Sequence, residues 1–304
     1  MSIALIAVVV ALLLGHAAPA LATSVRDFGW FSHWLRWLDA RFPDDGGFWR
    51  GRYGIALALL PPLLLVALFQ LALDAPLLGL AGLLFAIAVL FYCWGPRDLD
   101  VDVEAIIAAP DPVARHAAAA ALWPHGGAPT VEGPALVEAV FANARQRWFG
   151  VLFWFLLLGP FGALLYRLAA LAADGEPAGT LPAATHAGAR WLLALLDWPV
   201  AQLMALSLAL VGNFDSVVGA WKEHGGASLR LDADFLGAAA RASVRSELAD
   251  AAMDDFADGA IDARTAMVAL GELPELRDAM SLVWRILLLW LAVLALFVLA
   301  GFVA

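Results

Sequence analysis

The chain has 304 residues, of which 63% are hydrophobic and only 15% are charged, and its mean hydropathy is +0.81. Soluble domains carry roughly 25% charged residues, so a soluble core of this length could not bury so much apolar surface, and the composition predicts a polytopic membrane protein. The net charge of −10 argues against a nucleic-acid partner, and the single cysteine, Cys93, excludes an intramolecular disulfide and a cysteine-based zinc site.

Uncharged apolar stretches near 20 residues mark about six candidate transmembrane helices. They lie at 3–22, 54–73, 77–94, 148–171, 191–212 and 282–303. The first ends like a signal-peptidase site, but no Lys or Arg precedes it, so we expect it to remain as a transmembrane helix. The fifth contains Asp197, Pro199 and Gln202, which leaves two alternatives: a broken span, or a helix buried against others.

The distribution of Lys and Arg predicts the orientation of these spans. Basic residues concentrate in 23–53, 95–147 and 213–281, whereas 172–190 holds only Arg190. Because cytoplasmic loops carry the excess of basic residues, we expect these three segments in the cytoplasm and both termini outside. Segment 174–189 is then an external loop.

The predicted division of the chain follows from these spans. It runs 1–94 (three transmembrane helices, with an interfacial helix at 28–42), 95–147 (cytoplasmic and helical), 148–212 (fourth and fifth membrane helices), 213–281 (cytoplasmic and helical) and 282–304 (C-terminal transmembrane helix). Phe28, Phe31, Trp34, Leu35 and Leu38 share one face of the interfacial helix.

The cytoplasmic segments are expected to be amphipathic helices. In 101–122 the prolines at 110 and 112 break the helical pattern, and Asp111 is placed to cap the second helix. Residues 131–147 form a helix that continues into the fourth span. Segment 232–271 has the three-and-four spacing of two amphipathic helices.

A polar group directly before the fourth span is the first candidate ligand-binding site. Asn143 and Arg147 share a helix face, Gln146 lies beside them, and Arg145 is close by. An amide beside a guanidinium can hold a phosphate or a carboxylate. The arginines also suit ordinary anchoring at the inner surface, whereas anchoring does not need the amide of Asn143.

Further polar residues are expected at the same membrane surface. Arg97 and Asp98 begin an acidic run that suits either a hard cation such as Mg²⁺ or a solvated helix start capped by Asp98. Asn213 and Asp215 follow the fifth stretch. Asp197, within that stretch, either pairs with Arg167 or Arg190, or caps a helix broken at Pro199.

Four blocks of sequence resemble the AmpE family. They are "GPRDLDVDVE" (95–104), "NARQRWFGVLFWFLLLGPFGALLYRL" (143–168), "LLDWPVAQLMALSLALVGNFDSVVGAW" (195–221) and "LVWRILLLWLAVLAL" (282–296). The resemblance implies a multi-pass protein of the bacterial inner membrane that modulates β-lactamase induction in connection with peptidoglycan recycling. It implies as partners the lipid bilayer and a cytoplasmic muropeptide amidase or another component of that pathway.

The AmpE family is in turn similar to the CobD/CbiB family of adenosylcobinamide-phosphate synthases, which implies an alternative function as a diverged amide-forming enzyme. Only that alternative needs Mg²⁺ and ATP; otherwise no cofactor is expected. Asn143 matches the Asn of that family's motif around the fourth span, but Ala142 and Gln146 stand where its carboxylates would be. No P-loop, zinc-protease or serine-hydrolase signature is present.

Overall fold

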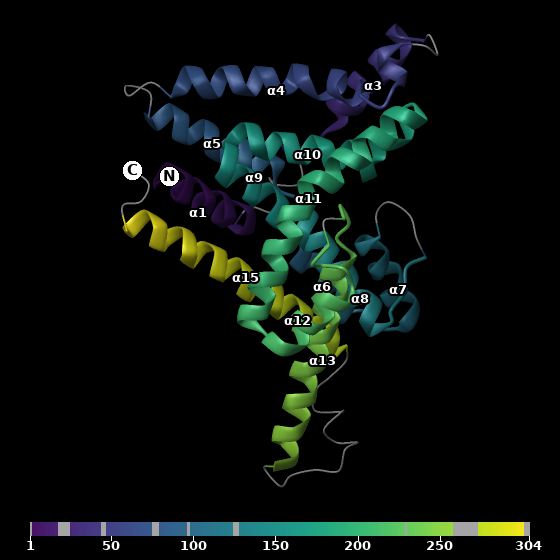
Figure 1. Ribbon diagram of the computed structural model, residues 1–304, viewed down its shortest axis with the longest axis vertical. Coiled ribbons are helices and arrows are strands. Elements are labelled where there is room, and N and C mark those ends of the chain that lie inside the picture. Colours follow the sequence, from purple (N-terminus) through teal and green to yellow (C-terminus); the bar gives the residue numbers. More distant parts are fainter. Residues whose placement is uncertain are drawn as a thin grey trace. The chain divides into compact units, whose positions relative to one another are not determined.

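Every element that the structure describes is helical (Figure 1), and the described residues contain no strand. This computed structural model describes residues 2–17, 25–43, 47–74, 79–95, 98–123, 128–228, 230–257 and 273–300. The all-α expectation is therefore confirmed for the described chain. The parts of the predicted spans at 18–22, 77–78 and 301–303, and residue Arg97, lie outside the described residues.

Three helices are long and apolar enough to cross a membrane: α4 (Gly54–Leu73), α11 (Ala183–Val211) and α15 (Pro274–Leu299). Two shorter apolar helices, α1 (Ser2–Ala17) and α5 (Gly79–Cys93), coincide with the predicted first and third spans. Length and composition thus identify a multi-pass membrane protein.

The chain forms two compact units, each built from separate stretches of sequence. Unit 1 comprises Met1–Arg97, Gln146–Asp197 and Leu291–Ala304, and unit 2 comprises Asp98–Arg145 and Trp198–Trp290. Helices α11 and α15 each contribute residues to both units.

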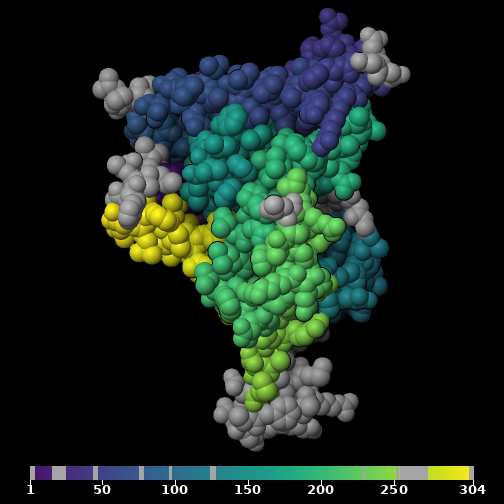
Figure 2. Space-filling model, viewed as in Figure 1, coloured from purple at the N-terminus to yellow at the C-terminus, as the bar shows by residue number. Residues whose placement is uncertain are grey.

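Unit 1 is a group of apolar helices packed side by side. The helices α4 and α5 lie next to each other, and α1 packs along α5 (Figure 1). One side of α4 is exposed, as Figure 2 shows, and it carries Leu60, Leu64, Leu65, Leu68, Phe69 and Leu71. An apolar helix that presents such a row of exposed leucines matches the lipid-facing side of a membrane helix.

The segment predicted as the fourth span is a helical hairpin, so the expectation of a single crossing at 148–171 is wrong. The helix α9 (Gly150–Leu158) ends at Gly159, whose φ of 68° suits glycine, and Pro160 begins α10 (Pro160–Asp174). Gln146 Nε2 donates to Asp174 Oδ2 at 3.0 Å. In one straight helix these residues would lie about 42 Å apart.

Close contacts along the hairpin confirm that its two arms are antiparallel neighbours. A Cβ on Gly150 would overlap the Tyr166 ring, and a Cβ on Gly162 would overlap the Trp154 carbonyl. With its nine residues, α9 is about 14 Å long, which is too short to cross a hydrocarbon core of about 30 Å.

The predicted interfacial helix exists as α3 (Gly29–Arg41), with Phe31, Leu35 and Leu38 buried. It packs against η5 (Glu176–Thr180), a short 3-10 helix in the segment predicted as an external loop. Elements in contact cannot lie on opposite sides of a bilayer. The expectation that 23–53 is cytoplasmic while 172–190 is external is therefore wrong, and the hairpin explains why, since it returns the chain to the side from which it came.

The fifth candidate span, at 191–212, is part of a single continuous helix. The helix α11 runs through Pro199, begins eight residues before the predicted start at 191, and half of its most apolar window is buried. A proline removes one backbone hydrogen bond but does not end a helix whose other bonds and packing remain. Of the two alternatives, the break at Pro199 is therefore wrong, and the structure agrees with a helix packed against others that is also long enough to serve as a span.

Unit 2 contains the predicted amphipathic helices. They are α6 (Leu99–Ile107), α7 (Pro112–Ala119), η3 (Ala120–Leu122), α8 (Gly133–Ala144), α12 (Phe214–Glu223) and α13 (Asp234–Ala257). Asp111 caps α7 as expected, its Oδ1 accepting from the Ala114 amide at 2.8 Å. The helix α13 packs on α8 and α12. The second helix predicted within 232–271 lies outside the described residues.

A π-helical turn, η4 (Arg145–Phe149), joins α8 to α9. The expectation that the helix at 131–147 continues into the next apolar segment is thus confirmed, with one wide turn at the junction. Such turns insert one extra residue and rotate the following side chains to new positions.

Candidate functional site

The predicted site residues are divided between the two units. Arg147 and Asp197 belong to unit 1, while Asp98, Asn143, Arg145, Asn213 and Asp215 belong to unit 2, and Arg97 lies outside the described residues. Each side chain lies among the residues of its own unit, and the local environments differ strongly.

The Asn143 side chain links two elements of unit 2 by hydrogen bonds. Its Nδ2 donates to the carbonyl of Leu122 at 2.9 Å and to that of Ala139 at 2.8 Å. The first bond joins η3 to α8, and the second lies within α8. Both amide protons therefore have acceptors. This structural role explains why an asparagine stands at position 143, which membrane anchoring does not explain.

Asn213 caps the N-terminus of α12. Its Oδ1 accepts from the Ser216 amide at 3.0 Å and from the Ser216 hydroxyl at 2.6 Å. Asp215 lies exposed in the first turn, where a negative charge interacts favourably with the helix dipole. An Asn three residues before a Ser at a helix start is a capping signal, which the sequence already contained.

The acidic run after Arg97 forms α6, so its carboxylates point to two faces. Asp98 stands at the N-cap position, but its side chain makes no capping hydrogen bond. Asp102 is only 1% exposed, so the expectation of a solvated acidic start is wrong there. Asp100 accepts from Trp284 Nε1 at 2.9 Å. No group of three or more His, Cys, Asp or Glu among the described residues could hold a metal ion.

Asp197 is buried in unit 1 and pairs with a residue that the sequence analysis missed. Tyr166 donates its hydroxyl proton to Asp197 Oδ1 at 2.6 Å, and Asp197 is 3% exposed. Neither Arg190, which is exposed, nor Arg167 forms an ion pair with it among the described residues. The expected arginine partners are therefore wrong. Both arms of the hairpin contact this part of α11: Trp154 of α9 donates to the Leu196 carbonyl at 3.1 Å, and Tyr166 of α10 donates to Asp197.

Arg147 is also buried, at 7% exposed, although anchoring arginines normally lie at a solvated surface. Its carbonyl accepts from the Gly95 amide at 3.1 Å, and its side chain fills the space where a Cβ on Gly95 would lie. Arg145 is half-buried at the start of the π-helical turn. Burial of Arg147 and Asp197 places two ionisable side chains inside the apolar unit, and such residues in membrane proteins commonly have a functional role or a buried partner.

Cys93 is fully buried at the end of α5, as expected for a small hydrophobe. Two buried residues of unit 1 were missed: Arg26, which donates to the carbonyls of Phe91 and Gly95, and Tyr166. No sequence signal marks Arg26, because its partners are backbone atoms about 65 residues away.

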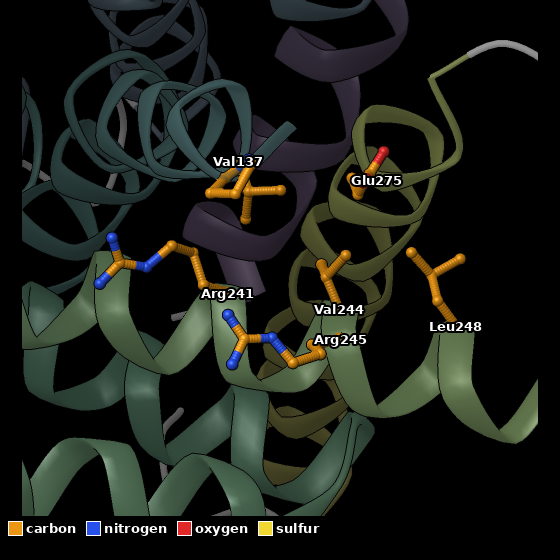
Figure 3. A pocket seen from close by; sticks show the side chains of 7 residues that line it. Val137, Arg241, Val244, Arg245, Leu248 and Glu275 are labelled. Atoms are coloured by element: carbon orange, nitrogen blue, oxygen red, sulfur yellow. The ribbon is translucent and has the colours of Figure 1, made fainter. Parts of the chain in front are cut away.

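Unit 2 contains a small pocket, which Figure 3 shows between α8, α13 and the start of α15. Its cavity measures about 140 Å³ and is lined by Pro134, Val137, Arg241, Val244, Arg245, Leu248 and Glu275. Residues 241, 244, 245 and 248 share one face of α13, as their spacing requires. Arg241 forms an ion pair with Glu138, while Arg245 is exposed.

An apolar floor with two guanidinium groups on one side and a carboxylate on the other can bind an amphiphilic or charged partner. Comparison with known protein families, with curated proteins and with solved structures finds no match to this chain.

Proposed function

We propose that this protein is a regulatory protein of the bacterial inner membrane that modulates β-lactamase induction in connection with peptidoglycan recycling, as its resemblance to the AmpE family implies. In this proposal unit 1 anchors the protein in the membrane, and the pocket of unit 2 receives a ligand or a protein of the recycling pathway. Multi-pass character and the pocket support the proposal, because a membrane regulator needs both an anchor and a polar binding surface.

One observation carries the proposal: the four blocks that carry the resemblance are joined to one another by side-chain hydrogen bonds. Trp284 of the fourth block donates to Asp100 of the first, and Tyr166 of the second donates to Asp197 of the third. Trp154 of the second block donates to the Leu196 carbonyl of the third, at 3.1 Å.

A further bond links Trp290 of the fourth block to Ser207 of the third, at 2.9 Å. Polar residues within apolar helices often hold neighbouring helices together. The four blocks therefore contain residues with specific tertiary roles in this chain, which supports the proposal that the resemblance reflects more than apolar composition.

The test is β-lactamase induction by an inducing β-lactam in a host from which this gene has been deleted. We expect deletion to change induction and the wild-type gene to restore it. Arg245→Ala, at the exposed side of the pocket, is expected to fail in restoration, while Lys222→Ala, on the surface of α12 outside the pocket, restores it. Immunoblots of membranes check that all variants accumulate equally.

Each outcome decides one part of the proposal. Unchanged induction after deletion overturns the regulatory function. Changed induction that Arg245→Ala restores as well as wild type overturns the role of the pocket while leaving the regulatory function in place.

A further inference from the structure

Three charged side chains line the pocket of unit 2, and the first of them, Arg241, is already compensated within the protein. Arg241 of α13 forms an ion pair with Glu138 of α8, and the Glu138 side chain passes close to Gly237 of α13. The pair thus joins the two helices that form the sides of the pocket, and it balances the positive charge of Arg241.

The second charge, Glu275, lies at a helix terminus. A Cβ on Gly133 would be 2.8 Å from Glu275 Oε1, so the carboxylate lies against the residue that begins α8. Glu275 is also an acidic residue in the first turn of its own helix, α15. The N-terminus of a helix carries a partial positive charge that stabilises a carboxylate, so both helix ends compensate Glu275.

The third charge, Arg245, is exposed, and no hydrogen bond or ion pair among the described residues engages its guanidinium. Figure 3 shows this guanidinium on the same side of Val244 as that of Arg241, whereas Leu248 lies toward the other side. Water alone can solvate an exposed arginine. Its importance here is its position, because it places a fork of N–H donors at the rim of an apolar cavity.

The rest of the pocket lining is apolar. Val137 and Val244 are 1% and 2% exposed, and Pro134 and Leu248 complete the walls. An apolar cavity of about 150 Å³ admits a molecule as large as benzene. The cavity of about 140 Å³ in unit 2 therefore has room for an apolar group of about five or six carbon atoms.

We infer that this pocket binds a small monocarboxylate, in which a carboxylate is joined to an apolar group of about five or six carbon atoms. The carboxylate accepts two hydrogen bonds from the fork of Arg245, and the apolar group packs on Val137 and Val244. The negative charge of Glu275 repels a second anionic group, which favours a monocarboxylate over a dicarboxylate.

The inference deepens the proposed function, because it rests on the part of that proposal that gives this pocket a ligand. It does not depend on the link to β-lactamase induction, since it follows from the charges and the size of the pocket alone.

The experiment measures binding of hexanoate to the purified full-length protein in phosphatidylcholine nanodiscs, by saturation-transfer NMR of the ligand. Empty nanodiscs measure the binding to lipid, which is subtracted. We expect saturable binding of hexanoate. Adipate, the dicarboxylate with the same number of carbon atoms, should bind at least about threefold more weakly, and hexylamine, which reverses the charge, should show no saturable binding.

Two variants assign the interactions to residues. Arg245→Ala should weaken hexanoate binding by about tenfold, because it removes charge-assisted hydrogen bonds. Arg277→Ala, at an exposed arginine of α15 outside the pocket lining, is the matched control and should bind like wild type. Glu275→Gln keeps the size of the side chain but removes its charge, so the preference for hexanoate over adipate should decrease.

Three results overturn the inference: no saturable binding of hexanoate to wild type, equal affinity in Arg245→Ala, or equal binding of hexylamine and hexanoate. If Arg245→Ala does not accumulate, Arg245→Gln replaces it, with the same expected loss. A preference for hexanoate that Glu275→Gln leaves unchanged overturns the role of Glu275.

Failure of this inference can be distinguished from failure of the proposed function. Absence of hexanoate binding removes the ligand class even where deletion of the gene changes β-lactamase induction. Unchanged induction after deletion removes the regulatory function, but saturable binding that depends on Arg245 still supports the ligand class.

Discussion

The two units differ in where most of their charged residues lie: of the described charged side chains that are buried, four belong to unit 1 and one, Asp102, belongs to unit 2. Unit 1 buries Arg26, Arg147, Arg167 and Asp197, and the contacts of these groups include backbone carbonyls, aromatic rings and the hydroxyl of a tyrosine. Unit 2 arranges several charges in partly exposed pairs, such as Arg241 with Glu138 and Arg285 with Glu247, whose side chains are between 23% and 48% exposed.

This difference indicates what each unit depends on. The loss of a buried hydrogen bond is costly because no water molecule takes the place of the missing partner. Exposed ion pairs contribute little to stability because water and salt compete for the same charged groups. Unit 1 should therefore be sensitive to single substitutions in its interior, and unit 2 should tolerate the loss of its surface pairs. Four experiments test this contrast, in order of decreasing effect.

The hairpin of unit 1 should show the largest effect. Gly162→Ala would place a Cβ 2.0 Å from the Trp154 carbonyl oxygen, which forces α9 and α10 apart. We expect a loss of about 3 kcal/mol in unfolding free energy, measured by equilibrium denaturation in mixed micelles. Gly79→Ala is the control, because its Cβ would meet nothing within 4 Å. Equal stability of the two variants would contradict the hairpin.

The buried bond between Tyr166 and Asp197 should have the next largest effect. Tyr166→Phe leaves the carboxylate without its hydroxyl donor, and we expect a loss of about 2 kcal/mol in the same measurement. Tyr53→Phe removes a hydroxyl from a side chain that is 70% exposed and should change stability by less than about 0.5 kcal/mol. Equal unfolding free energies for Tyr166→Phe and Tyr53→Phe would contradict the contrast between the units.

The amide of Asn143 provides an intermediate case inside unit 2. Asn143→Ala removes both bonds that this side chain donates and should cost about 1 kcal/mol, since the carbonyls of Leu122 and Ala139 are left to find other donors. Glu223→Ala, exposed at the end of α12, is the control. A loss of activity in Asn143→Ala without any loss of stability would point to ligand binding instead of a structural role.

The smallest effect is expected at the surface of unit 2. A double-mutant cycle with Arg241→Ala and Glu138→Ala should give a coupling energy of about 0.5 kcal/mol, which decreases as salt is added. A coupling above about 2 kcal/mol, insensitive to salt, would show that unit 2 also depends on its ion pairs, and the comparison between the units would no longer hold.

The sequence alone was sufficient for the features that depend on local pattern. Composition located α4 and α15, the apolar face of α3 was visible at residues 31, 35 and 38, and the cap at Asp111 follows from its position before Pro112. These features need only the neighbours along the chain, so periodicity and capping rules are enough to identify them.

Features that depend on distant residues could not be predicted. The dipeptide at 159–160 is compatible with a kinked span as well as with a hairpin, and only contacts between distant residues, such as the bond from Gln146 to Asp174, distinguish the two. Charge alone suggested Arg167 or Arg190 as the partner of Asp197, but the hairpin presents Tyr166 instead. Arg26 was missed since its acceptors are carbonyl groups, which every residue has.

The hairpin also has a consequence for how this protein is made. The apolar helix α9 is too short to cross a bilayer by itself, so we expect it to become fixed in the membrane only after α10 has been synthesised. The two arms should then enter the membrane together, as one unit closed by the tight turn at Gly159 and without transferring the following loop to the far side. The order of synthesis, and not hydrophobicity alone, would thus determine on which side the second half of the chain begins.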